Sequence, residues 1–192
     1  MDEFPGQEIV VVCDGNDNSD NIVKSFSFRY PNIRLLSFGG RLGKGGALIQ
    51  GFKVAEGEEI CFVDADESVS TDDLKGMFHA LHDVDGVIAS RRLKESKILI
   101  MQPIKRRLAS KAFNIFVRML FGLPFKDTQC GAKVFKKDAI LDILDDLKTS
   151  GFEIDVEILW RLKKRYVFSW PASRLAFGDY SILSAPMLPV SS

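Results

Sequence analysis

Two aspartates stand two residues apart after a short apolar run. Asp64 and Asp66 follow Cys61-Phe62-Val63, and in an extended backbone residues i and i+2 point the same way, so both carboxylates can meet one cation. A divalent ion held by one or two carboxylates completes its shell with phosphate oxygens and water, and it could neutralise a diphosphate leaving group. The alternative is an acidic turn capping the next helix, which is favoured for such a triplet alone. Placement at the end of a buried strand shifts the balance toward a site.

An earlier carboxylate and a glycine-rich segment form a second candidate region. Asp14 follows an apolar strand in Asp14-Gly15-Asn16-Asp17, where it could bind a nucleobase or ribose or could belong to a polar turn. Arg41-Leu42-Gly43-Lys44-Gly45-Gly46 resembles a phosphate loop, but its spacing fits neither the Walker loop nor the dinucleotide fingerprint. It predicts a turn at a helix N-terminus, which can approach a phosphate or a base and is equally compatible with a structural role.

Basic residues supply candidate anion ligands. Arg91-Arg92 follows the fourth predicted strand, and Lys105-Arg106-Arg107 begins a later segment. Arginine suits bidentate phosphate recognition, although a solvated surface charge is the simpler interpretation of each group. The segment 113–121 that follows is apolar on nearly every side. It predicts either core, which is favoured, or a membrane-facing surface.

Composition narrows the class of protein. The 192 residues fit one domain, and 26 basic against 26 acidic residues argue against a nucleic-acid binder. The 2 histidines are too few for a histidine-based metal centre, so oxygen ligands are expected. The 3 separated cysteines indicate neither a disulfide framework nor a zinc site and predict a reducing compartment. Cys130 has no histidine base beside it in sequence, so we expect it to be buried and inert. The N-terminal residues do not show a signal-peptide pattern, and without an apolar run of about 18 residues we expect no spanning helix within these 192 residues.

Strands and helices alternate in the first half of the chain. Apolar periodicity and turn residues predict strands at 9–13, 33–38, 60–63 and 86–90, with helices at 21–30, 47–55 and after Ser70. This alternation predicts right-handed βαβ units and a mostly parallel sheet, in which ligands sit beyond the carboxyl ends of the strands. Asp14, Asp64, Asp66 and Arg91 all fall there. The second half predicts helices at 104–121, 139–147 and 154–162, a strand at 166–170 and a loose remainder.

The order of these segments resembles family 2 glycosyltransferases of the GT-A fold. The resemblance begins with Val10 to Gly15, Arg41 to Gly45, Phe62 to Asp66 and Ala89 to Arg91. Two further segments resemble the branch that includes dolichyl-phosphate β-glucosyltransferase and dolichol-phosphate mannose synthase. They are Asp127-Thr128-Gln129-Cys130-Gly131 and Gly151-Phe152-Glu153-Ile154-Asp155. The similarity runs from about residue 8 to residue 170.

The resemblance implies an α/β, GT-A architecture with a mostly parallel central sheet flanked by helices. It implies a single domain over residues 1–192, in which 1–100 bind a nucleotide sugar, 101–175 face the acceptor and 176–192 form a loose tail. Relatives begin with a strand reading roughly Val-Ile-Pro-Ala-Tyr-Asn-Glu, which forms part of the nucleotide pocket. The residues before Glu8 do not match it, so we expect the usual first strand to be lacking.

The resemblance also implies roles for individual residues. Asp14 would contact the donor nucleobase and Lys44 the neighbouring nucleotide loop. Asp64 would contact the donor and Asp66 the metal, Mg²⁺ or Mn²⁺, with Ser68 a weaker ligand than the Gln that relatives often carry there.

The acceptor side is implied in the same way. Arg91 matches a phosphate-contacting position, and Asp127 and Gln129 match the loop beside the sugar and acceptor. Arg106 is a further candidate for the acceptor phosphate. The predicted catalytic set is therefore Asp64, Asp66 and Asp127.

The implied reaction is an inverting transfer of glucose or mannose from a UDP- or GDP-sugar to a polyprenyl phosphate. It would take place in the cytoplasm or peripherally at the cytoplasmic membrane face. No nucleic-acid partner is expected, and the oligomeric state is not predicted. A sugar-phosphate nucleotidylyltransferase is one alternative, but it predicts the arginine-containing glycine loop after the first strand rather than the second. A non-catalytic remnant that serves as a binding or scaffold module is another, and it would be favoured over the transferase if neither UDP nor GDP bound in the presence of Mn²⁺.

Overall fold

The computed structural model describes most of the chain. The described residues are 6–64, 69–82, 84–90, 97–98, 104–125, 127–166, 177–181 and 183–184. For residues 97–98, 104–109, 166, 177–181 and 183–184 only the backbone is described.

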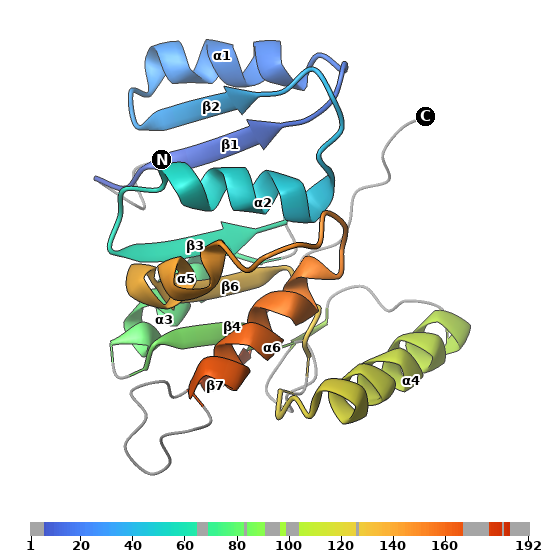
Figure 1. Ribbon diagram of the computed structural model, residues 1–192. Helices are drawn as coiled ribbons and strands as arrows, with labels where there is room; N and C mark the ends of the chain where they lie inside the picture. The colour runs from blue at the N-terminus through green and yellow to red at the C-terminus, as the bar shows by residue number, and fades with distance from the viewer. Residues whose placement is uncertain are drawn as a thin grey trace.

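The first three elements form a unit of their own at one end of the molecule (Figure 1). Strand β1 (Ile9–Cys13) pairs in parallel with β2 (Ile33–Ser37), with Ile9 opposite Ile33, and helix α1 (Ser19–Arg29) connects them. We call these elements the N-terminal unit. Among the described residues, the second edge of β1 has no strand partner.

A four-stranded sheet forms the centre of the molecule, with strand order β3-β6-β4-β7. Its strands are β3 (Glu59–Val63), β6 (Ala132–Lys136), β4 (Gly86–Ser90) and β7 (Phe177–Ser181). β4 and β7 are parallel, whereas β6 is antiparallel to both β3 and β4. The prediction of a mostly parallel sheet is therefore correct for β1–β2 and β4–β7 and wrong for β6. The reason is local, because the Asp64 N–H donates to the Gly131 carbonyl at 2.9 Å, so β6 starts at the edge where β3 ends and must run back.

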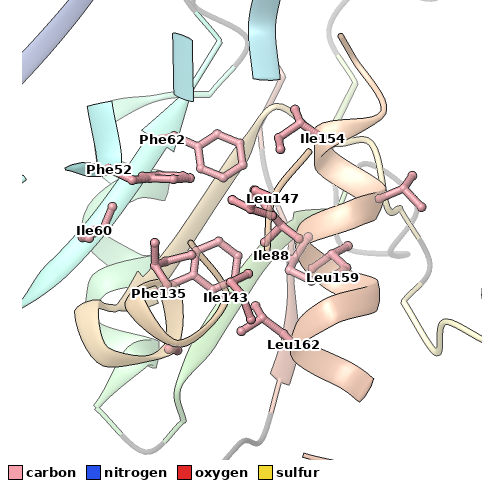
Figure 2. Packing of buried hydrophobic residues seen from close by; sticks show 14 of the residues in the cluster. Phe52, Ile60, Phe62, Ile88, Phe135, Ile143, Leu147, Ile154, Leu159 and Leu162 are labelled. Atoms are coloured by element: carbon pink, nitrogen blue, oxygen red, sulfur yellow. The ribbon is translucent and has the colours of Figure 1, made fainter. Parts of the chain in front are cut away.

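Helices cover both faces of this sheet. They are α2 (Gly43–Val54), α3 (Thr71–Leu81), α5 (Lys137–Leu144) and α6 (Ile154–Tyr166). Strand alternation separates the faces: Ile88 of β4 packs in the cluster with α2, α5 and α6, whereas Val87 and Ala89 pack against α3. In the larger cluster the Phe62 and Phe135 rings lie 6.3 Å apart, with Phe52 6.0 Å from Phe62 (Figure 2).

Helix α4 (Ile104–Phe121) lies apart from these layers, away from the sheet (Figure 1). Within residues 110–121, only Asn114 and Val117 are buried. The expected core role of 113–121 is therefore confirmed for Val117 and wrong for most of the segment. No helix in the described part of the chain is long and apolar enough to cross a membrane.

The remaining sequence predictions agree in part. The helix expected at 47–55 begins four residues earlier, at Gly43, because the glycine-rich turn is itself its first turn. The tail expected to be loose contains β7, and β8 (Leu183–Ser184) pairs with β5 (Lys97–Ile98), so strand pairing overrides a composition rich in turn residues. The strand expected at 166–170 lies outside the described residues except for residue 166, which ends α6.

Candidate active site

Asp14 holds the start of helix α2 against the end of β1. Its Oδ2 accepts hydrogen bonds from the N–H groups of Leu42 (2.9 Å) and Gly43 (2.8 Å). The first N–H groups of a helix lack partners within the helix, and a carboxylate there satisfies them and complements the helix dipole. This contact supports the polar-turn interpretation of Asp14, while its contact with a nucleobase stays a prediction.

We call residues 41–46 the glycine turn. Its glycines permit close packing against the loop that contains Thr149 and Ser150. Gly43 has φ +74°, and a Cβ on Gly45 would lie only 2.2 Å from the Thr149 carbonyl oxygen. The Gly45 and Gly46 N–H groups donate to the Ser150 carbonyl at 2.8 and 3.3 Å. Four backbone donors of this turn are thus already used, two by Asp14 and two by Ser150. A backbone phosphate cradle is disfavoured here, which leaves the Lys44 side chain as the group that could meet a phosphate.

Lys44 lies in a line of alternating charges that we call the charge chain. Its Nζ is 2.9 Å from Asp64 Oδ1 and 2.7 Å from Asp155 Oδ2. The other oxygen of Asp155 is 2.5 Å from Lys133 Nζ, which also donates to the Cys130 carbonyl at 2.7 Å. The side chains become more exposed along this line, from Lys133 (0%) and Asp155 (3%) to Lys44 (15%) and Asp64 (38%). The chain therefore connects the core to a half-exposed carboxylate.

The electrostatics of the charge chain are balanced. Burial alone would lower the pKa of Lys44, but the carboxylates of Asp155 and then Asp64 raise it above its ordinary value. Lys44 is therefore a firmly charged ammonium next to Asp64. Because two cations alternate with two anions, each buried charge has a partner, which is the condition under which such groups are tolerated inside a protein.

Sequence reasoning missed Lys133 and Asp155 as members of the site. A signal was present for Lys133, since a lysine in the middle of the apolar segment Ala132–Lys136 needs a buried anion as partner. Nothing local identifies that partner, because Asp155 lies 22 residues away in the first turn of α6.

Asp64 lies against the loop that precedes β6. A Cβ on Gly131 would be 2.1 Å from Asp64 Oδ2, so glycine is required for the carboxylate to lie on that backbone. Asp66 and Ser68, the other predicted metal ligands, lie outside the described residues. In the described part of the chain no group of three or more metal-binding side chains gathers.

The loop 127–131 carries two predicted acceptor-side residues, Asp127 and Gln129, and contacts Asp64 through Gly131. Asp127 and Thr128 are buried, and Thr128 Oγ1 accepts from Asn114 Nδ2 of α4 at 3.2 Å. Gln129 is partly exposed and lines a cavity of about 420 Å³ between α4 and α6. The structure thus brings Asp14, Lys44, Asp64 and this loop together.

The predicted arginine ligands are not placed. Arg91 lies outside the described residues, and Arg106 lies in α4, where only the backbone is described. Cys130 is buried, as expected. His79 of α3 and His82, which follows the helix, are both exposed. Burial raises the pKa of the Cys61 thiol to about 12, so this residue is no nucleophile.

Glu157 of α6 fixes the loop on which the glycine turn rests. It accepts from the Thr149 N–H (2.8 Å), the Thr149 hydroxyl (2.7 Å) and the Lys148 N–H (3.1 Å), and Arg161 pairs with it at 2.7 Å. Burial alone would raise the pKa of Glu157, but the bonds from Thr149 and then Arg161 hold it below its ordinary value. Glu157 thus supports the site from behind.

The sequence of the chain is similar to those of transferases that are named for dolichyl phosphate or undecaprenyl phosphate. The chain is 30% identical to dolichyl-phosphate beta-glucosyltransferase from Dictyostelium discoideum over 96% of its own length and 58% of the relative's. It is 33% identical to the Saccharomyces cerevisiae protein of the same name, over 79% of this chain and 51% of the relative. It is 28% identical to undecaprenyl-phosphate mannosyltransferase from Micrococcus luteus, over 86% and 71%. The chain thus spans little more than half the length of the first two relatives.

Solved structures share the fold. Glucosyl-3-phosphoglycerate synthase from Mycobacterium tuberculosis, in complex with Mn²⁺, UDP-glucose and phosphoglyceric acid, superposes with a TM-score of 0.61 at 14% identity, over 92% of this chain and 59% of that one. A mannosyltransferase from Pyrobaculum calidifontis, in complex with GDP-mannose and Mn²⁺, gives 0.57 at 16% identity, over 95% and 48%.

The family model described as glycosyl transferase family 2 matches residues 3–144. This match covers the glycine turn, Asp64 and the loop 127–131, as well as most of the sheet. The predicted family and the GT-A fold are therefore confirmed. The chain belongs to glycosyl transferase family 2.

Proposed function

We propose that this chain carries the donor-binding site of an inverting hexosyltransferase, which moves glucose or mannose from a UDP- or GDP-sugar to a polyprenyl phosphate. The observation that carries the proposal is the charge chain, because it fixes Lys44 and Asp64 beside the loop 127–131 at one edge of the sheet. The names of the relatives support a lipid-phosphate acceptor, and the solved structures with UDP-glucose and GDP-mannose support the donor class.

The residues present fit a divalent cation in part. Asp64 offers a half-exposed carboxylate, which is the ligand type that Mg²⁺ and Mn²⁺ prefer, although its Oδ1 is already paired with Lys44. This favours Asp66, with support from Asp64 and Ser68, as the main ligand. A bound cation would neutralise charge on the departing nucleoside diphosphate.

The side chains of the protein would then do the positioning. The Lys44 ammonium would bind a diphosphate oxygen, and Asp64 would orient the donor through its remaining oxygen. The acceptor phosphate oxygen attacks the anomeric carbon as the bond to the diphosphate breaks. That nucleophile is already anionic, so no strong general base is required, and buried Asp127 suits a role in holding its loop. Arg91, Arg106 and Gln129 are proposed to hold the acceptor phosphate.

The acceptor class also suggests where the protein works. Polyprenyl phosphates are membrane lipids, so we place the protein peripherally at the cytoplasmic face of a membrane.

A transfer assay tests the proposal. Purified protein would be incubated with UDP-glucose or GDP-mannose, a short-chain polyprenyl phosphate and Mn²⁺ or Mg²⁺, with product read by mass. Because the second edge of β1 has no strand partner among the described residues, a second version would carry an added strand at its N-terminus. We expect metal-dependent transfer that Asp66→Ala abolishes, whereas Asp72→Ala, at an exposed position, leaves it intact. Full activity in Asp66→Ala would exclude the metal assignment.

A second candidate is a non-catalytic binding module of the same family. It is favoured by the edge of β1 that has no strand partner in the described part of the chain, and by the four backbone donors of the glycine turn that are already used. A lack of UDP and GDP binding in both versions of the protein, with Mn²⁺ present, would support it. Family membership argues against the nucleotidylyltransferase alternative.

A further inference from the structure

Helix α4 exposes an apolar surface where a helix of a globular protein normally carries polar groups. Five large apolar side chains on it are half or more exposed: Phe113 (50%), Ile115 (53%), Phe116 (57%), Met119 (72%) and Leu120 (63%). At about 100° per residue these five lie within an arc of about 160°, and the buried Asn114 and Val117 point elsewhere. We call the five residues the outer face of α4.

The outer face continues toward the candidate site. Phe113 and Val117 line the cavity of about 420 Å³, together with Phe152 from the loop before α6, and Phe152 is itself 72% exposed. Gln129 of the loop 127–131 lines the same cavity, and this loop contacts Asp64 through Gly131. An apolar path therefore runs from the site to the outer face, and exposed apolar patches of this kind mark interaction surfaces.

The charge of α4 indicates what covers it. The helix contains Lys105, Arg106, Arg107, Lys111 and Arg118 and no acidic residue, although the whole chain has equal numbers of basic and acidic residues. Three of these bases lie in the first turn, and Lys111 lies between them and the apolar segment 113–121. Apolar side chains combined with basic residues are what a helix needs to lie on an anionic bilayer.

We propose that the outer face of α4 docks onto an anionic lipid bilayer, with the helix lying along the headgroup region. This proposal rests on the proposed function, because a polyprenyl phosphate is delivered in the plane of a membrane. The docked helix would hold the cavity open to the bilayer, so that the acceptor reaches the loop 127–131 without leaving the lipid phase.

Vesicle sedimentation tests the proposal with the full chain. Vesicles of phosphatidylcholine with about three tenths phosphatidylserine should bind the protein more strongly than phosphatidylcholine alone, and added salt should weaken binding. Phe116→Glu and Leu120→Glu should each reduce vesicle binding about tenfold or more, since each removes a large apolar group that the bilayer would bury. Lys111→Glu should weaken binding to the anionic vesicles only. The matched control is Phe28→Glu, because Phe28 is 93% exposed on α1 in the N-terminal unit, and it should bind like the wild type.

The outcomes separate this inference from the proposed function. Wild-type protein that fails to bind vesicles but binds UDP or GDP would overturn the docking surface alone. Vesicle binding without any nucleotide binding would overturn the proposed function alone. Equal vesicle binding by Phe116→Glu and the wild type would also contradict membrane docking. So would a wild-type dimer that Phe116→Glu dissociates, because that result would assign the outer face to a second copy of the chain. Circular dichroism of each variant checks that the fold is kept.

Discussion

The N-terminal unit and the four-stranded sheet are built from similar strands but differ in burial. Every residue of β4 is buried, whereas β1, with the more apolar sequence Ile-Val-Val-Val-Cys, contains no buried residue and α1 has none either. The sheet has helices packed on both faces, while β1 contacts mainly β2 and α2. The apolar content of a strand therefore does not decide its burial, which depends on the elements that cover it.

The candidate site lies where these two regions meet. Asp14 belongs to the N-terminal unit, whereas Lys133, Asp155 and Asp64 belong to the sheet and α6. The glycine turn joins them, through Asp14 on one side and Ser150 on the other. Asp64 and its ionic partners thus rest on well-packed structure, whereas Asp14 depends on a region with few buried residues, where local opening costs less free energy.

The largest expected change in stability comes from the buried ion pair between the four-stranded sheet and α6. Asp155→Ala leaves Lys133 fully buried without its anion, so we expect the free energy of unfolding in urea to fall by about 3–5 kcal/mol. The double variant Lys133→Met/Asp155→Leu should recover most of that loss, because no unpaired charge remains. A control in the N-terminal unit, Asp20→Ala, breaks a surface pair with Lys24 and a local hydrogen bond from the Asn21 N–H, and it should change little. A similar loss from Asp20→Ala would contradict the difference between the regions.

A matched pair of valines tests the same comparison through packing. Val87→Ala in β4 removes two methyl groups from a fully packed position and should cost about 2–3 kcal/mol. Val11→Ala in β1 makes the same chemical change at a partly exposed position, and we expect less than half that cost. Urea denaturation measures both. Equal losses would show that β1 is covered as well as β4.

A single added methyl group tests the glycine turn, which joins the N-terminal unit to the loop before α6. Gly45→Ala places a Cβ against the Thr149 carbonyl, so the start of α2 must move away from the loop before α6, at a cost of about 1–3 kcal/mol. Nucleotide affinity should fall with it, because Lys44 moves relative to Asp64. Gly39→Ala is the control, since a Cβ there meets nothing within 4 Å. Unchanged stability and affinity in Gly45→Ala would separate the glycine turn from the site.

The smallest expected effect depends on pH. The pKa of Glu157 is lowered in the folded protein, so its contribution to stability is fully present above its unfolded value near 4.5 and is lost as the pH falls through the folded pKa. Glu157→Gln should therefore destabilise the protein at pH 7, and the difference from wild type should shrink below about pH 4.5. Denaturation at pH 7 and at pH 4 measures it, and a pH-independent difference would argue against an ionic role.

Local sequence patterns were enough to predict many helices and strands, but they did not show which strands pair or in which direction. The strand at Gly86–Ser90 and the helix at Ile104–Phe121 have the predicted bounds, since each has a continuous apolar pattern between clear boundaries. The antiparallel direction of β6 could not be predicted, because it depends on where the loop 127–131 returns to the sheet. β7 was missed for a similar reason, since it exists by pairing with β4.

The candidate site was predictable to a similar degree. Asp14, Lys44 and Asp64 were identified because they follow apolar strands or lie in a glycine-rich turn, and the structure brings them together. Lys133 and Asp155 were missed because their ion pair joins distant segments. The phosphate-loop interpretation of the glycine turn was weakened by contacts that spacing does not reveal, namely those with Asp14 and Ser150.

The central claim is that Lys44 and Asp64 form the donor site, and calorimetric titration of UDP and GDP in the presence of Mn²⁺ tests it most directly. We predict metal-dependent binding of one nucleotide to the wild type, and an affinity about tenfold or more lower in Lys44→Met, because a charge-assisted contact to phosphate is lost. Lys75→Met, at a half-exposed position on α3, should bind like the wild type. Binding that is absent from the wild type, or unchanged in Lys44→Met, would contradict the account.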